Sequence, residues 1–160
     1  MTRKARIAVL SSTVLVGVLL LAPALGAVAS AEERTIYIAA IEPKGGTTVD
    51  KEPFPARELP KGPGYVRKAP DASGRWEVSV YQWSPTTVVV KQGDRVTLEI
   101  VGINGAVHIA HVDKYHPEQF AVKRGEVTRI QFTADTPGLF KIHCRNHEPT
   151  MEGYLVVLPR

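Results

Sequence analysis

The chain's only cysteine stands close to a histidine and a methionine near the C-terminus. In the stretch FKIHCRNHEPTMEGYLVVLP these residues are Cys144, His147 and Met151, and the only other methionine is Met1. A copper ion that transfers electrons is held by two imidazoles and one thiolate, with a weak axial thioether. The stretch offers a thiolate, one imidazole and a thioether within a short loop. We therefore predict that Cys144, His147 and Met151 bind copper, one ion per chain.

The second imidazole has to come from one of the remaining histidines, which are His108, His111, His116 and His143. In AVHIAHV, side chains alternate between the two faces of a strand, so His108 and His111 point to opposite sides. In LFKIHC the same alternation separates His143 from Cys144. We predict His108 as the ligand and keep His111 as the alternative, because a shift of one residue in register would exchange their faces. His116 and His143 are assigned no role.

Each of these residues also has a structural interpretation. Cys144 could be a buried core thiol, His147 a solvated loop residue and Met151 a core side chain before YLVVL. Zinc is the other metal to consider, but it prefers nitrogen, sulfur and oxygen ligands without a thioether. The grouping of the three residues in one loop and the presence of Met151 favour copper.

The N-terminus has the pattern of an export signal. A basic start, MTRKAR, precedes the apolar run IAVLSSTVLVGVLLLAPALGAVA, and the small residues ASA precede EER. We predict that residues 1–31 are a signal peptide cleaved after Ala31, which makes the protein periplasmic or secreted. The alternative is an uncleaved membrane anchor, since the run exceeds the roughly 18 apolar residues that span a bilayer. Membrane attachment is expected only in that case.

Export of the protein would change its net charge and would place its single cysteine in an oxidising compartment. The formal net charge is +4, and it falls to about +1 when Arg3, Lys4 and Arg6 leave with the signal. This is no basic surface for nucleic acid, and we expect none to bind. A lone cysteine in an oxidising compartment has no internal disulfide partner. Coordination to a metal would protect it.

The rest of the chain has strand and turn signals and no helical period. Residues 34–41, RTIYIAAI, predict a first strand. Residues 42–74 are dense in proline, glycine and charge, and we expect a long surface excursion with little regular structure. Beyond them short strands recur at about ten-residue spacing, as in an all-β sandwich or barrel. We therefore divide the mature chain into an N-terminal strand with the excursion, residues 32–75, and a core of residues 76–160 that includes the first strand.

Four stretches in this order resemble the cupredoxins and together reach from about residue 76 to 158. They are YQWSPTTVVVKQGDRV, GAVHIAHVDKY, VTRIQFTADTPGLFKIHC and CRNHEPTMEGYLVVL. The resemblance implies a Greek-key β-sandwich with one mononuclear type 1 copper ion. It implies His108, Cys144, His147 and Met151 as the ligands. Three residues separate His147 from Met151, whereas loops in the family commonly have two or four at this place.

Related copper domains need residues that this chain lacks. Its approach strands also resemble the dinuclear copper domains of cytochrome oxidase subunit II and nitrous oxide reductase, but Phe140 stands where those domains have a second cysteine. Multicopper oxidases flank their cysteine with histidines on both sides, whereas Arg145 follows Cys144 here. Nitrosocyanin, a red copper protein that the chain also resembles, has a glutamate where we predict His108. These differences leave the mononuclear site.

The resemblance implies an electron carrier more than an enzyme. We expect one-electron transfer with redox partner proteins, either cytochrome c-like or oxidoreductases, and His147 as the exit for the electron. One alternative is a red-copper-like enzyme acting on a small molecule, which needs an open coordination position that four protein ligands do not leave. The other is a periplasmic copper carrier, which usually gathers several methionines or histidines. The mature chain keeps a single methionine, Met151.

Overall fold

The computed structural model describes residues 30–59 and 61–160, and this part of the chain is built from strands. The predicted signal peptide, residues 1–31, lies almost wholly outside the described residues. Within them, no helix is long and apolar enough to cross a membrane.

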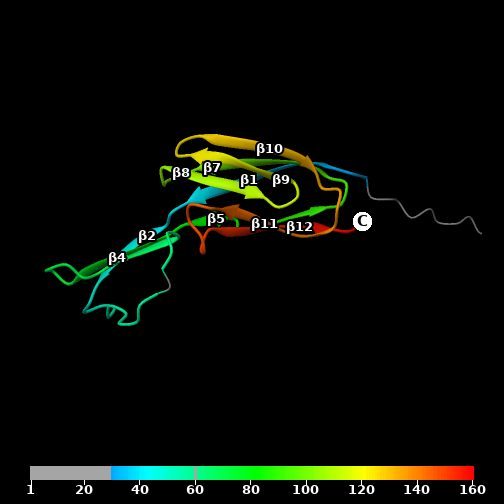
Figure 1. Ribbon diagram of the computed structural model, residues 1–160. Helices are drawn as coiled ribbons and strands as arrows, with labels where there is room; N and C mark the ends of the chain where they lie inside the picture. Colours follow the sequence, from blue (N-terminus) through cyan, green and yellow to red (C-terminus); the bar gives the residue numbers. More distant parts are fainter. Residues whose placement is uncertain (1–29, 60) are drawn as a thin grey trace, which may run out of the picture.

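Two sheets form the body of the molecule (Figure 1). The first has the order β10–β7–β1–β5, with β1 (Glu33–Ile41), β5 (Gln82–Ser84), β7 (Arg95–Gly102) and β10 (Val127–Thr133). The second has the order β6–β12–β11–β8–β9, with β6 (Thr87–Lys91), β8 (Val107–Val112), β9 (His116–Lys123), β11 (Gly138–Cys144) and β12 (Glu152–Leu158). β1 is parallel to β7 and β6 to β12, while the other neighbours are antiparallel. The predicted all-β, Greek-key β-sandwich is confirmed.

The core lies between these two sheets. In β7 every second residue is buried, so Val96, Leu98 and Ile100 face inward while their neighbours are partly exposed. Leu155 and Val157 of β12, in the other sheet, belong to the same apolar cluster. A period of two along a strand is the pattern of a sheet with one buried face. Burial of these aliphatic side chains therefore holds the two sheets together.

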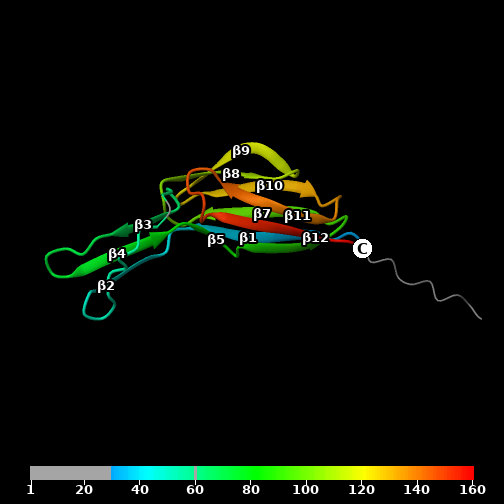
Figure 2. The ribbon, with the colours of Figure 1, turned by 60° about the horizontal axis from the view of Figure 1, so that its bottom comes forward.

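A third sheet projects from one end of the sandwich (Figures 1 and 2). Its order is β2–β4–β3, with β2 (Lys44–Thr48), β3 (Tyr65–Lys68) and β4 (Arg75–Val80). The expectation of little regular structure in residues 42–74 is therefore wrong for β2 and β3. Both strands are short and mostly exposed, so their sequences carry no apolar alternation that would have revealed them.

The stretch WEVSVYQW, residues 76–83, is divided between two sheets. β4 ends at Val80 in the projecting sheet, and β5 begins at Gln82 in the sandwich. Tyr81 is the residue between them, and its backbone N–H donates to the carbonyl of Gly64 (2.8 Å). The predicted boundary between residues 75 and 76 falls inside β4, and the division into domains stays a prediction.

Candidate metal centre

Three of the predicted ligands lie together where β8 and β11 meet the following loop. Cys144 Sγ is 3.3 Å from His147 Nδ1 and 3.9 Å from His108 Nδ1, and the two Nδ1 atoms are 3.1 Å apart. Cys144 and His108 are fully buried, and His147 is half-buried. One sulfur and two imidazole nitrogens therefore face a common point, as a metal ligand set would require.

The register between β8 and β11 decides which histidine reaches the cysteine. Cys144 pairs with Ala110, so His108, two residues before Ala110, lies on the same face as Cys144. His143 pairs with His111, and both lie on the other face of the sheet. The structure thus brings His108 to the cysteine and leaves the alternative, His111, on the outer side. That His108 is a ligand stays a prediction.

A backbone carbonyl determines which ring nitrogen of His108 carries the proton. Its Nε2 lies 3.0 Å from the carbonyl oxygen of Asn104, and a carbonyl can only accept, so Nε2 carries the proton. The lone pair of Nδ1 is then free to point at Cys144 and His147. The Asn104 side chain is fixed in turn, because its amide exchanges two hydrogen bonds with the backbone of Glu42 (2.6 and 2.8 Å). The sequence gives no obvious signal for this role of Asn104.

Burial keeps these donors uncharged. Burial lowers the pKa of His108, and burial together with the neighbouring His108 lowers the pKa of His147, so both imidazoles are neutral at pH 7. Burial raises the pKa of the Cys144 thiol to about 11. Neutral imidazoles are the form that binds metals, and a bound cation favours the thiolate strongly enough to overcome such a shift. The chemistry of the donor set therefore fits a soft or borderline metal ion.

Met151 follows the loop immediately before β12. Its side chain is fully buried in the apolar cluster that also contains Cys144. Its backbone N–H donates to the carbonyl of His147 (3.1 Å), which closes the last turn of the loop. The backbone of Met151 is therefore adjacent to that of His147, and the thioether of Met151 as a fourth ligand stays a prediction.

Hydrogen bonds tie the loop to β8. Arg145 donates its backbone N–H to the carbonyl of Ile109 (2.9 Å), and the Asn146 side chain accepts from the Ile109 N–H (3.1 Å). The N–H of His147 donates to the carbonyl of Cys144 (3.1 Å). Asn146 thus continues the ladder between β8 and β11 beyond the end of the strand, and so positions His147.

Gly64 of the excursion and the side chain of Tyr81 both pack on the ligand loop. The Tyr81 ring stacks on the His147 ring, with centroids 3.7 Å apart and planes 13° from parallel. Gly64 is buried against the loop, and the Thr150 hydroxyl donates to its carbonyl. A Cβ at position 64 would lie 2.4 Å from both the His147 carbonyl oxygen and the Thr150 hydroxyl oxygen. Only glycine fits such an approach. The proline- and glycine-rich composition was the one available signal, and it does not say where the chain docks.

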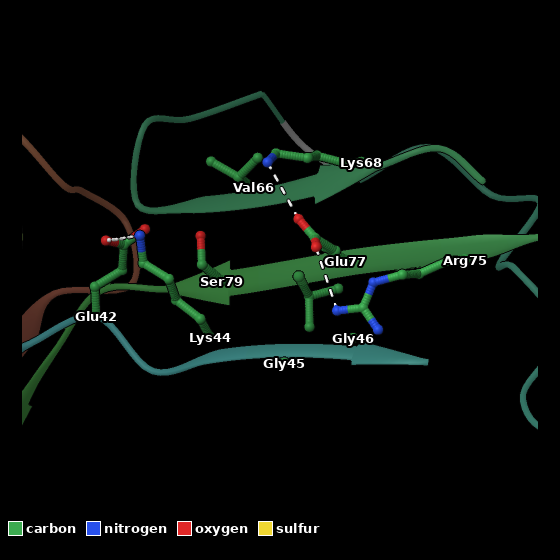
Figure 3. A pocket seen from close by; sticks show the side chains of 10 residues that line it. Glu42, Lys44, Gly45, Gly46, Val66, Lys68, Arg75, Glu77 and Ser79 are labelled. Atoms are coloured by element: carbon green, nitrogen blue, oxygen red, sulfur yellow. Dashed lines mark hydrogen bonds and ion pairs between the residues drawn. The ribbon is translucent and has the colours of Figure 1, made fainter. Parts of the chain in front are cut away.

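A surface cleft of about 340 Å³ lies on the projecting sheet and not at the histidine–cysteine group (Figure 3). Its charges are paired with one another, Lys44 with Glu42 at 3.1 Å, and Lys68 and Arg75 with Glu77 at 3.2 and 3.3 Å. Glu42 is itself buried. The cleft therefore does not supply donors to the metal centre.

An all-β sandwich with a buried cysteine and two histidines at one junction is the architecture of a metal-binding domain of the copper class. Residues 66–157 match the family model described as the cupredoxin-like domain, which is more than half of the chain. The chain therefore belongs to the cupredoxin-like family and has its copper-binding fold, as the motifs predicted. Among curated proteins, none matches the sequence.

The solved structures that align with this chain include copper enzymes. The copper nitrite reductase from Nitrosomonas europaea aligns with a TM-score of 0.50 at 19% identity, over 79% of this chain and 42% of that one. A multicopper oxidase, mgLAC, aligns with a TM-score of 0.49 at 17% identity, over 81% of this chain and 40% of that one. The chain thus spans about two fifths of the length of these proteins. At this identity the nitrite reductase shows a shared fold and nothing more.

Proposed function

We propose that the protein transfers single electrons through one mononuclear copper ion bound by His108, Cys144, His147 and Met151. The observation that carries the proposal is the meeting of Cys144 Sγ with His108 Nδ1 and His147 Nδ1, all within 3.9 Å of one another. Two imidazoles and a thiolate, with a weak axial thioether, are the donor set of copper electron-transfer sites. Zinc sites do not use the thioether.

The protein's own contribution is a fixed arrangement of donors. Bound copper supplies the reversible one-electron couple. Cys144 and His108 are held by paired strands, His108 is oriented by the Asn104 carbonyl, and the loop is tied to Ile109. Little movement of these residues is therefore needed when the charge at the site changes by one, which favours fast transfer.

The proposal assigns His147 as the exit for the electron. It is the only one of the four predicted ligands that is not fully buried, and its ring stacks on the half-buried ring of Tyr81. A redox partner, cytochrome c-like or an oxidoreductase, would dock over this part of the surface. Such a carrier would work in the periplasm or outside the cell, and would be tied to a membrane only if residues 1–31 were retained.

The test is an optical and EPR spectrum of residues 32–160 loaded with Cu²⁺. We expect an intense visible thiolate-to-copper band that a reductant bleaches, one copper per chain, and loss of the band in Cys144→Ser. His116→Ala, at a histidine outside the site, is the matched control and should keep the band. A colourless protein would contradict the proposal and favour a copper carrier. Turnover of a small molecule at the copper would instead favour an enzyme.

A further inference from the structure

A second group of possible metal donors lies on the outer face of the sheet that carries Cys144. It consists of His111 on β8, His143 on β11 and Asp113 just after β8, each offering one donor atom within 4.8 Å of the others. His111 and His143 are directly opposite in the antiparallel pair β8–β11. Opposite residues of such a pair have close Cβ atoms, so two imidazoles there reach the same ion without any change in backbone.

The side chains lie side by side. The rings of His111 and His143 are stacked, parallel to within 5° with centroids 4.3 Å apart, so one ring has to turn about its side-chain bonds before both lone pairs meet at one ion. Asp113 Oδ1 lies 3.1 Å from His143 Nε2 and 3.8 Å from His111 Nε2. Tetrahedral ligands at about 2.0–2.1 Å from an ion are about 3.4 Å from each other, and the two distances bracket this value.

The surroundings of Asp113 and His143 have the pattern found around bound metals. The backbone N–H of Lys141 reaches Asp113 Oδ2 (3.4 Å), which leaves Oδ1 toward the two histidines. His143 Nδ1 lies 3.9 Å from a carboxylate oxygen of Glu148, which is beyond hydrogen-bond distance. A small movement of the Glu148 side chain would bring it to the second nitrogen of His143, where a carboxylate commonly fixes a ligand histidine.

The fold makes little use of His111. Its Nδ1 is buried and has no hydrogen-bond partner among the described residues. Its Nε2 is 3.8 Å from Asp113 Oδ1, beyond hydrogen-bond distance. A histidine in this state weakens the sheet that holds it, since buried polar groups normally have partners. Coordination through Nε2 would give that nitrogen a partner, and the proton of the ring would then lie on the buried Nδ1.

We propose that His111, His143 and Asp113 form a second metal site, for a divalent ion of the zinc and copper(II) kind. The donor set of two imidazoles and one carboxylate suits these ions, and it lacks the sulfur ligands of the first site. The side chains of Cys144 and His143 point to opposite faces of β11, so the two sites are separated by the sheet. The proposal does not rest on electron transfer at the first site.

The test is the binding of Zn²⁺ to residues 32–160, with the bound metal counted by equilibrium dialysis. Cys144→Ser impairs the first site, so zinc retained by this variant reports on the second. We expect it to keep one equivalent, and the ring ¹⁵N signals of His111 and His143, followed by NMR, to shift as that equivalent binds. His143→Gln in the same background should weaken this binding at least tenfold, and Asp113→Asn, at a half-exposed position, should weaken it too.

His116→Gln in the Cys144→Ser background is the matched control, because His116 lies outside the group, and it should leave zinc binding unchanged. Zinc binding that His143→Gln and Asp113→Asn leave unaltered would overturn the proposal, as would the absence of any zinc in Cys144→Ser. Retained zinc that shifts the ring signal of His108 instead of those of His111 and His143 would overturn it as well.

Discussion

At the scale of single residues, Met151 differs from the other three proposed ligands in what its loss should do. The thiolate and the imidazoles are strong donors, whereas an axial thioether is weak and mainly tunes the reduction potential. Met151→Leu keeps an apolar side chain of similar volume in a fully buried position. We expect the variant to keep its copper and its visible band, and to have a higher potential, because the oxidised ion loses more from a missing donor than the reduced one.

The measurement is a redox titration followed at the visible band. Each tenfold change in the relative affinity for the two oxidation states moves a one-electron potential by about 59 mV. A potential equal to that of the unaltered protein would show that Met151 is only a core residue. Loss of both the colour and the copper would show that the site needs Met151 to hold its copper. The assignment of Met151 as a weak axial ligand would then be wrong.

At the scale of elements, the contact of Gly64 in the excursion with the ligand loop can be tested by a substitution. In Gly64→Ala the new methyl group would meet the His147 carbonyl and the Thr150 hydroxyl at 2.4 Å, so the loop or the excursion has to move. Overpacking of this kind costs about 1–3 kcal/mol. We expect a lower free energy of unfolding in urea and a changed copper spectrum, since His147 is part of the displaced loop.

Gly45→Ala is the matched control for that substitution. Gly45 lies on β2, in the same excursion, but the nearest atom to its added Cβ is 3.9 Å away, which is ordinary contact. The control should leave both stability and spectrum nearly unchanged. Equal effects of the two substitutions would mean that the excursion as a whole, and not its docking at Gly64, accounts for the change.

Elements differ in how far the sequence could predict them. β7 was predictable because Val96, Leu98 and Ile100 alternate with polar residues. The ligand loop between β11 and β12 was predictable because its motif sets the order of the donor residues. β2 and β3 were not, since short and mostly exposed strands leave no clear apolar pattern. The packing of Gly64 on the loop and the stacking of Tyr81 on His147 depend on parts of the chain that are distant in sequence. Local patterns do not report such contacts.

At the scale of the whole molecule, Glu32 and the C-terminal Arg160 meet at one buried carboxylate, that of Asp94. Asp94 accepts hydrogen bonds from the backbone N–H groups of Lys91 (3.0 Å) and Glu32 (3.2 Å) and pairs with the Arg160 side chain. It thereby joins the turn between β6 and β7, the residue before β1 and the C-terminus. Figures 1 and 2 place the C-terminus at the end of the sandwich away from the projecting sheet. The carboxylate therefore stabilises the end remote from the metal centre.

This arrangement predicts a pH-dependent stability. Burial alone would raise the pKa of Asp94, but the hydrogen bonds from Lys91 and Glu32 and the pair with Arg160 outweigh it and lower the pKa. A lowered folded-state pKa stabilises the fold above the unfolded value of about 3.9, and this contribution is lost as the pH falls through the folded-state value. Asp94→Asn should lower the free energy of unfolding at pH 7 by about 2 kcal/mol, because hydrogen bonds to a charged acceptor are lost.

The decisive comparison is between urea unfolding of the unaltered protein and of Asp94→Asn at pH 7 and again near pH 3. The difference between the two proteins should shrink at the lower pH, because the carboxyl of the unfolded chain, with its higher pKa, is then largely protonated and the free-energy advantage of the native carboxylate falls with pH. Glu118→Gln, at an exposed position on β9, is the control and should show no such difference. A difference that is the same at both pH values would mean that Asp94 acts through its shape and not its charge, and that the contact between Glu32 and the C-terminus does not depend on the ion pair with Arg160.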